Sequence, residues 1–471
     1  MTHQDHYIAG AWVRASGHRS IPVVNPFTEQ VIAEVPDGTP EDAVAAVLAA
    51  RTAFNEWAAT PLAKRTQLVH DLAEALRARR AELIELTIDE LGAPRRDASA
   101  SQVDLPIDVL DWLAEAADEV EFKSTDGNVT VLREPFGVVS CITPWNYPLH
   151  QLVVKVGAAL VMGCTVVLKP SEVTPLSAIV FAEEVNRVGF PAGVFNLVNG
   201  RGPVVGEVLA SHPEVDFVSF TGSTAAGTRV AELAARTVKK VSLELGGKSA
   251  SVILPDADFD FAVKQTVARC FENSGQACSA LTRMLVPRSE LARAEDIAAV
   301  AASEYLLGDP RDPQTVLGPV VSDAQRARVR NHIDRAIDDG ARLVIGGSEQ
   351  PTDQSHGYFV KPTVLSRVTP DMPIARDEVF GPVLAILGYD DVDEAVRTAN
   401  ATDYGLSSAV WGTNANLVDE VARQMRAGQV IVNGGAWNFR APFGGYKQSG
   451  LGRESGVFGL EEFLEIKALR A

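Results

Sequence analysis

The chain has few cysteines and no long apolar run. Its four cysteines show neither the CxxC spacing of a zinc site nor the even framework of a small secreted scaffold. We therefore expect reduced thiols and no metal site. The longest apolar run, 156–168, is too short to cross a bilayer and is typical of a core helix that leads into a buried strand. Because the N-terminus lacks the cationic start and apolar core of a secretory signal, we expect a cytoplasmic location.

Basic side chains are also scarce relative to acidic ones. The 471 residues include 43 Lys and Arg against 61 Asp and Glu, a formal net charge of −18. A charge of that sign repels phosphate backbones and acidic lipid surfaces, and no local basic patch overrides it. The sequence therefore predicts neither nucleic acid nor a membrane as a partner. Repeats and low-complexity runs are absent as well, which favours a compact enzyme of two domains with a small third element.

Short β-branched segments follow a helical N-terminal stretch. Residues 40–120 are rich in Ala, Leu, Glu and Arg, with apolar positions every three or four residues, which predicts several amphipathic helices. Between 129 and 247, and again between 249 and 435, β-branched runs end in Gly, Pro or Ser and alternate with helical stretches. This alternation is typical of parallel α/β sheets, so we expect two α/β domains. Ligands of such sheets bind beyond the carboxyl ends of the strands.

Two of the segments at predicted strand ends carry prolines beside polar side chains. In TPWNYP, two prolines bracket Asn146 and restrict its backbone, which suits either a structural turn or a fixed hydrogen-bond donor. In LKPSE, Lys169 ends an apolar strand and Glu172 follows it. That lysine is either a solvated strand cap or, with Glu172, a partner for the hydroxyls of a ribose.

Two further strand ends are rich in glycine. FTGSTAAG, with Gly222 and Ser223, follows a strand and opens a helix, so it is either a simple turn or a phosphate site at a helix N-terminus. In LELGGK, Glu244 lies in a run that otherwise indicates a buried strand end. A desolvated carboxyl there has a raised pKa and can act as a general base, unless it is paired with Lys248.

A cysteine stands among small residues in the stretch FENSGQACSALTR. Gly275, Ala277 and Ser279 surround Cys278 and leave room for a substrate carbon to approach the sulfur. A nucleophilic thiolate is one interpretation, and a buried inert thiol is the other. The eight histidines show no catalytic spacing to Cys278, which disfavours a Cys/His hydrolase.

In this order and spacing, these segments resemble the aldehyde dehydrogenase superfamily, whose NAD(P)-dependent members oxidise aldehydes to carboxylic acids. The resemblance extends from NPFTEQVIAEVP near the start through EVFGPV at 378–383 to PFGGYKQSGLGRE at 442–454. It implies a Rossmann-like parallel-sheet NAD-binding domain, a second α/β catalytic domain and a small β oligomerisation element. The corresponding residues are 1–117 with 137–247, 248–446, and 118–136 with 447–471, respectively.

The resemblance also implies a role for each matching residue. Cys278 matches the nucleophile, Glu244 the general base and Asn146 the side-chain donor to the oxyanion. The positions that match cofactor-binding residues are Trp145, Lys169, Glu172, Gly222, Ser223, Glu378 and Phe380. The positions that match the substrate tunnel are Tyr147, His150, Gln151, Trp437 and Phe443.

These roles predict a metal-independent enzyme that oxidises a small-molecule aldehyde through a thioester on Cys278. We expect NAD rather than NADP, because the Glu172 carboxylate would repel a 2′-phosphate. Arg283 is the only arginine that closely follows Cys278, and Arg440 is the other candidate for binding a carboxylated aldehyde. The family's pairing through a β-hairpin and the C-terminal strand implies a homodimer or homotetramer. Transfer of the acyl group to coenzyme A and a non-catalytic scaffold are rival readings, and an intact Glu244 argues against the first of them.

Overall fold

The helical N-terminal stretch forms as the apolar spacing predicts. In the computed structural model, which describes residues 3–470, Thr39 begins the first helix by a reciprocal capping box with Asp42. Gly92 ends the third helix in the left-handed conformation, at φ 77°. The helices of this stretch are α1 (Pro40–Ala58), α2 (Leu62–Ala78), α3 (Arg80–Leu91), α4 (Arg95–Ser99) and α5 (Leu105–Ala116).

The first lobe is built on an eight-stranded sheet whose central strands are parallel. In sheet order its strands are β19 (Gly450–Leu451), β11 (Lys240–Glu244), β10 (Phe217–Thr221), β7 (Val138–Ile142), β8 (Thr165–Lys169), β9 (Phe195–Leu197), β1 (Asp5–Ile8) and β2 (Ala11–Arg14). The other elements of this lobe are β3 (Ser20–Val24), β4 (Val31–Pro36), α6 (Pro148–Val161), α7 (Leu176–Val188), α8 (Glu207–Ser211), α9 (Thr224–Ala235) and α16 (Gly456–Glu461). The sequence analysis predicted the parallel strands but not the antiparallel β1, β2 and β19.

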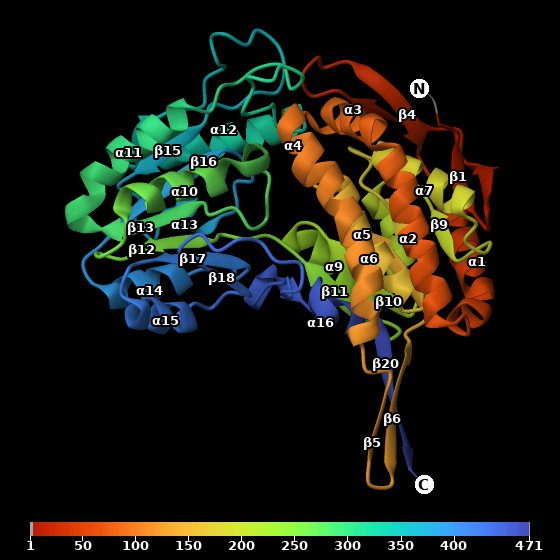
Figure 1. The fold of residues 1–471 in the computed structure, drawn as a ribbon. Coiled ribbons are helices and arrows are strands. Elements are labelled where there is room, and N and C mark those ends of the chain that lie inside the picture. Colours follow the sequence, from red (N-terminus) through yellow and green to blue (C-terminus); the bar gives the residue numbers. More distant parts are fainter. Residues whose placement is uncertain (1–2, 471) are drawn as a thin grey trace.

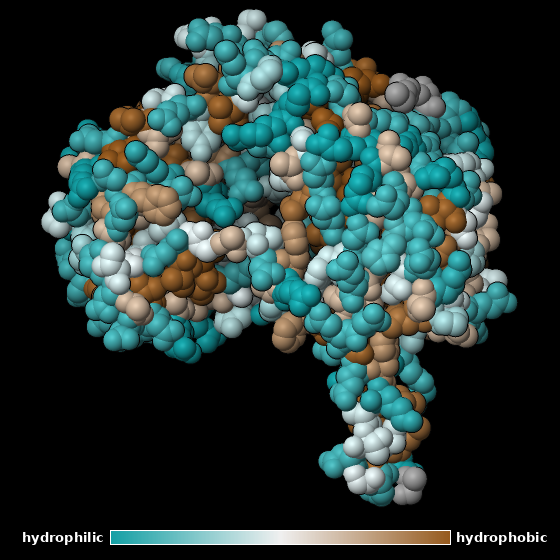
Figure 2. Space-filling view, viewed as in Figure 1, coloured by the Kyte–Doolittle hydropathy of each residue, from teal (hydrophilic) through white to brown (hydrophobic). Residues whose placement is uncertain are grey.

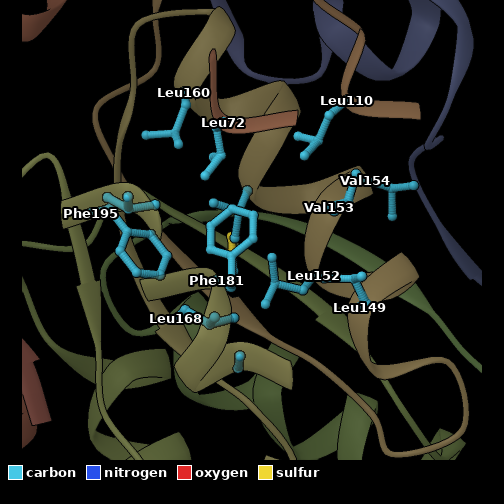
Figure 3. Close-up of a cluster of buried hydrophobic side chains, with 14 of the residues drawn as sticks. Leu72, Leu110, Leu149, Leu152, Val153, Val154, Leu160, Leu168, Phe181 and Phe195 are labelled. Carbon is cyan, nitrogen blue, oxygen red and sulfur yellow. The ribbon is translucent and has the colours of Figure 1, made fainter. Parts of the chain in front are cut away.

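The main core of this lobe lies between the sheet and the helices α2, α5, α6 and α7. Figure 3 shows the rings of Phe181 and Phe195 beside Leu72, Leu152 and Leu168, all of them buried. Every residue of helix α6 except His150 is buried, and the helix leads into β8, as the run at 156–168 predicts. A helix of this kind is stable only inside a protein, so α6 and β8 form a rigid base for the residues at their ends.

The second lobe repeats the α/β architecture on a seven-stranded sheet. Its order is β14 (Arg342–Ile345), β15 (Thr363–Ser366), β16 (Val383–Tyr389), β13 (Arg283–Pro287), β12 (Ala250–Ile253), β17 (Ser407–Trp411) and β18 (Gln429–Val432). All neighbours are parallel except β14 and β15. The helices are α10 (Phe259–Phe271), α11 (Leu291–Ser303), α12 (Asp323–Asp338), α13 (Pro373–Arg376), α14 (Val392–Asn400) and α15 (Ala415–Gln424).

A three-stranded β arm projects from the first lobe (Figure 1). It consists of β5 (Lys123–Asp126), β6 (Val129–Pro135) and β20 (Leu464–Arg470), and β20 pairs with β6 along its whole length. The arm therefore occupies only part of the ranges 118–136 and 447–471. Within the second range, β19 pairs with β11 of the first sheet and α16 packs against α5.

The chain crosses between the lobes directly after β11. Residues 245–249 join the last parallel strand of the first sheet to β12 of the second. Figure 2 shows the molecule hollowed between the two lobes. Between residues 3 and 470, no helix has the length and apolar character needed to cross a membrane. All four cysteines are free thiols, as their spacing predicts.

Candidate active site

Glu244 is the last residue of β11 and lies between two neighbouring strands. In the sheet register it faces Thr221 of β10 on one side and Gly450 of β19 on the other. Its side chain is 2% exposed, and neither carboxyl oxygen has a hydrogen-bond partner. A Cβ atom on Gly444 would lie 2.7 Å from Oε1, so the chain packs closely against the carboxyl group. A buried carboxyl without partners is costly for folding, which is typical of a group kept for chemistry.

Burial raises the pKa of the Glu244 carboxyl well above its usual range, and the Glu454 carboxylate raises it further. Lys155 and Arg453 oppose this effect. The alternative in which Glu244 pairs with Lys248 is wrong, because the buried Lys248 Nζ has no hydrogen-bond partner. Burial instead lowers the pKa of Lys248 to about 8.

Cys278 follows a tight turn at the end of α10. Asn273, Ser274 and Gly275 have φ angles of 51°, 57° and 71°, three consecutive residues in the left-handed region. Such strain persists only where the surroundings enforce it. A Cβ atom on Gly275 would lie 2.1 Å from the carbonyl of Gly381, and the Ser274 hydroxyl donates to the Gly318 carbonyl at 2.9 Å. The turn therefore fixes where the following thiol points.

Cys278 is partly exposed, whereas Cys141, Cys164 and Cys270 are buried. Burial of its surroundings raises the pKa of the Cys278 thiol, and the carboxylates of Glu244, Glu378 and Glu454 raise it further. The thiol thus lies within electrostatic reach of Glu244, so the structure brings the sulfur and the carboxyl into one site. Burial and mutual repulsion therefore disfavour both anions in this site.

The amide of Asn146 lies beside the loop that carries Cys278. Its Nδ2 donates to the carbonyl of Gln276 at 2.9 Å, which uses one of its two N–H groups. Its backbone carbonyl accepts from Gln102 at 3.0 Å and from Asn273 at 2.9 Å. These contacts hold Asn146 rigidly against the turn, and its second amide N–H is left available to a ligand.

Gly247 lies three residues after Glu244 and packs against the loop that carries Cys278. A Cβ atom on this residue would lie 2.4 Å from the carbonyl oxygen of Cys278. Its backbone N–H donates to Glu378 Oε1 at 2.9 Å. The two glycines of LELGGK are therefore required for close approach, since a Cβ on Gly246 would also lie 2.5 Å from Glu378.

Lys169 and Glu172 lie at the carboxyl end of β8. Lys169 is 3% exposed, so the solvated-cap alternative is wrong. Its Nζ donates to the carbonyls of Pro170 and Gly200 at 2.7 and 2.9 Å, and to Glu172 Oε2 at 3.4 Å. All three N–H groups have acceptors, so a ribose hydroxyl would replace one of them, and the long contact to Glu172 is the weakest.

Two of the other positions predicted to bind the cofactor lie where β10 leads into α9. Ser223 caps α9 by accepting from the Ala226 N–H at 3.3 Å, and Gly222 precedes it. A helix of 12 residues that begins here offers N–H groups and a positive dipole end to a phosphate. From the opposite lobe, Phe380 packs edge-on against Trp145, with ring centroids 5.3 Å apart. Phe380 has a φ of 59°, a strained backbone that fixes its ring.

A cavity of about 600 Å³ opens beside Cys278. All five residues predicted for the substrate tunnel line it, namely Tyr147, His150, Gln151, Trp437 and Phe443. Glu244 and Asn146 do not line this cavity. Arg283 and Arg440 do not line it either. Arg283 is buried against the carbonyls of Lys248, Thr398 and Ala399, and Arg440 pairs with Glu119.

Sequence reasoning missed a buried ion pair next to Glu244. Lys155 of α6 and Glu454 form this pair, and both act on the pKa of Glu244. The sequence carried a signal, because Lys155 is the only Lys, Arg, Asp or Glu in α6 and stands among mostly apolar residues. In the described part of the chain, no cluster of three or more His, Cys, Asp or Glu side chains is placed to hold a metal ion.

Comparison with known proteins decides the family. The model of the aldehyde dehydrogenase family matches residues 12–469. The chain belongs to the aldehyde dehydrogenase family. It is 47% identical over 469 residues to a 3-succinoylsemialdehyde-pyridine dehydrogenase from a Pseudomonas species, covering 99% of this chain and 98% of that one.

Solved structures of aldehyde dehydrogenases have the same fold. Aldehyde dehydrogenase C from Pseudomonas syringae, a Cys-to-Ala mutant complexed with NAD+ and octanal, superposes with a TM-score of 0.98 at 48% identity, covering 99% of this chain and 96% of that one. An NAD+ complex of an aldehyde dehydrogenase from Bacillus cereus gives 0.96 at 38% identity, covering 100% and 96%. The predicted family, fold class and enzyme class of this aldehyde dehydrogenase are confirmed.

Proposed function

We propose that this aldehyde dehydrogenase oxidises an aldehyde to the carboxylic acid with NAD, through a thioester on Cys278. The observation that carries the proposal is the buried, partnerless carboxyl of Glu244 within electrostatic reach of the Cys278 thiol. A proton acceptor of raised pKa beside a fixed sulfur suits acyl transfer followed by hydrolysis. Relatives supply further support, since the P. syringae and B. cereus enzymes were crystallised with NAD+.

In the first step, the Cys278 thiol loses its proton to water and the sulfur attacks the aldehyde carbon. The oxygen that becomes anionic accepts the free N–H of the Asn146 amide, whose other N–H is held by Gln276. One donor of this kind contributes about 3 to 4 kcal/mol to the transition state. Asn146 needs no reorganisation, because two hydrogen bonds to the Cys278 turn and one from Gln102 already fix it.

The residues at the sheet edge fit NAD. Lys169 and Glu172 would hold the adenosine ribose, and the N-terminus of α9 with Ser223 would hold the pyrophosphate. Trp145, Glu378 and Phe380 would border the nicotinamide side. NAD supplies, when bound, a positively charged acceptor for the hydride. Glu172 disfavours a 2′-phosphate, so NAD is preferred over NADP.

In the second step, Glu244 removes a proton from a water that attacks the thioester carbon. The C–S bond to the acyl carbon breaks, the carboxylic acid leaves, and the Cys278 sulfur takes the proton from Glu244 to restore the thiol. A raised pKa makes Glu244 a stronger base than a solvated carboxylate, and burial keeps its proton from bulk water. The neighbouring pair of Lys155 and Glu454 holds opposite charges close to this carboxyl.

A direct assay tests the proposal. The purified chain is mixed with NAD or NADP and a panel of aldehydes that includes octanal, and reduced nicotinamide is followed by absorbance. We expect NAD reduction that depends on the aldehyde and releases the acid without coenzyme A. Ester hydrolysis without nicotinamide would favour a thiol hydrolase, and acyl transfer only to coenzyme A would contradict the role of Glu244. An absence of any turnover would favour a scaffold.

The β arm is proposed as the oligomerisation element. β20 forms one edge of its sheet, and Ile466 and Leu469 are 70% and 48% exposed on it. An exposed strand edge with apolar side chains seeks a second strand. We therefore expect a homodimer or a homotetramer. In each subunit, residues 1–117 and 137–247 would bind NAD, and residues 248–446 would provide the nucleophile. A single species of 50.3 kDa at micromolar concentration in sedimentation would contradict this assembly.

A further inference from the structure

The cavity beside Cys278 offers no free positive charge. Its charged lining residues in the described chain are Arg269, Glu272 and Glu454. Arg269 is paired with Glu272 at 3.4 Å, and Glu454 is paired with the buried Lys155. A substrate carboxylate would have to compete for Arg269 next to a carboxylate that repels it, so the cavity disfavours acidic aldehydes.

Most of the cavity wall is apolar and aromatic. The rings of Trp437 and Phe443 lie 5.6 Å apart at an angle of 51°. Other apolar lining residues are Leu105, Tyr147, Val154, Leu281, Val430 and Ile431. A wall of this kind binds an aryl or alkyl stem by burial of its surface.

Two polar side chains of α6 interrupt this wall. Gln151 is 7% exposed, and its Oε1 is buried without a hydrogen-bond partner. Its Nε2 makes no hydrogen bond to the described chain, yet it is not one of the buried atoms that lack a partner. The Nε2 atom is therefore exposed, and because Gln151 lines the cavity, we place this atom at the cavity surface. The same elimination applies to His150, whose Nδ1 is buried without a partner, so its Nε2 reaches the cavity.

The His150 imidazole is neutral at physiological pH. Burial, followed by the charge of Lys155, lowers the pKa of His150 to about 4. The cavity therefore presents an uncharged imidazole and an amide, both with hydrogen-bonding capacity that the protein leaves unused. A ligand group that fills this capacity gains binding energy, and an apolar group there leaves the polar atoms unpaired.

We propose that this enzyme selects uncharged aldehydes in which an aryl or alkyl stem carries a hydrogen-bonding group, such as a hydroxyl or ketone, bound by Gln151 and His150. The inference rests on the proposed function, because it takes the cavity as the aldehyde site. It makes Gln151 and His150 specificity-determining residues that take no part in the chemistry at Cys278.

Three aldehydes of similar size test the proposal. 4-(Hydroxymethyl)benzaldehyde carries the hydrogen-bonding group, 4-ethylbenzaldehyde is its apolar isostere, and 4-formylbenzoate carries a charge. For each, kcat/KM with NAD is measured in the wild type, in Gln151→Leu and Gln151→Met, and in Gln67→Leu. Gln67 lies exposed on α2, so its variant makes the same chemical change away from the cavity.

The ratio of kcat/KM for the hydroxymethyl compound to that for the ethyl compound cancels differences in stability and active-site concentration. We expect Gln151→Leu and Gln151→Met to lower this ratio about three- to tenfold, with Gln67→Leu equal to the wild type. The formylbenzoate should be the poorest substrate of the wild type. Retained turnover of 4-ethylbenzaldehyde reports that the variants fold.

Unchanged ratios in both Gln151 variants would overturn the proposal, as would a wild type that prefers 4-formylbenzoate. Either result would leave the proposed function intact, because NAD would still be reduced. A wild type that oxidises none of the three aldehydes and none of the wider panel would instead overturn the proposed function itself.

Discussion

Replacing Glu244 by glutamine separates the two halves of the proposed reaction. The amide has the size of the carboxyl but does not accept a proton at neutral pH. Because Glu244 is 2% exposed and makes no hydrogen bond, the substitution exchanges one partnerless buried group for another and breaks no contact. We therefore expect Glu244→Gln to fold with close to wild-type stability, so that its kinetics report on chemistry.

The expected effect is confined to hydrolysis of the thioester. A positioned general base contributes roughly 10²- to 10⁴-fold to the rate of its step. At about 1.36 kcal/mol per tenfold change, this corresponds to about 2.7 to 5.4 kcal/mol of transition-state free energy. Steady-state kcat should fall by that factor, while the first turnover still produces about one reduced nicotinamide per active site.

Stopped-flow absorbance of reduced nicotinamide measures both phases, and mass spectrometry of the quenched enzyme detects the acyl group on Cys278. Glu420→Gln is the matched control, because Glu420 is exposed on α15 of the second lobe. Equal loss of the burst and of steady turnover in Glu244→Gln, with Glu420→Gln unchanged, would refute the role of Glu244 in deacylation.

Glu244→Gln should also change the pH dependence of the steady-state rate. Because burial raises the pKa of Glu244, its proton-accepting form increases as pH rises beyond the ordinary carboxyl range. The steady-state rate of the wild type should rise with pH, and the part of this rise that reports on Glu244 should vanish in Glu244→Gln. Identical profiles for the two proteins would contradict the assignment.

Three further substitutions test other parts of the structure. Cys278→Ala should abolish NAD reduction. Its control, Cys270→Ala, alters a buried thiol and should retain NAD reduction. Wild-type turnover in Cys278→Ala would contradict the proposed mechanism. Gly247→Ala places a Cβ 2.4 Å from the Cys278 carbonyl oxygen, so the Cys278 loop has to move. This displacement of Cys278 should slow the burst of NAD reduction roughly 10²-fold. An unchanged burst rate would contradict the close packing of Gly247 against Cys278. Burial raises the pKa of Glu90 from 4.5 to about 8, so its contribution to stability is complete below pH 4.5 and is lost as pH rises through 8. The Tm of the wild type should therefore fall more steeply between pH 4.5 and 8 than that of Glu90→Gln, and thermal unfolding with equal slopes would exclude this linkage.

Local patterns predicted most elements of the fold. The β-branched runs at β7, β8, β10 and β11 were identified because each is short and ended by Gly, Pro or a polar residue, and β7, β8 and β10 are buried throughout. β17, with the sequence SSAVW, was missed because its two serines obscure a fully buried strand. β19 consists of only two residues, and its pairing with β11 depends on contacts 200 residues apart that no local pattern records.

The candidate site, like the fold, was predicted from the sequence only in part. Cys278, Glu244 and Asn146 were identifiable because their residue types and neighbours suit the chemistry. Lys155 and Glu454 were not, because a charge becomes part of a site only when the fold buries it beside another. The alternatives left open for Lys169 and Glu244 were decided by burial and by partners, which are properties of the folded chain.

Motif order and the periodicity of apolar side chains were enough to predict the family, the two α/β lobes and the three residues proposed for the chemistry. The environment of the proposed site depends on the folded chain. The close packing of Gly247 against the Cys278 carbonyl, the missing partners of Glu244 and the neutral polar pair in the cavity wall arise from packing between segments distant in the chain. Packing sets burial, and burial sets the pKa and the hydrogen-bonding capacity left for a substrate.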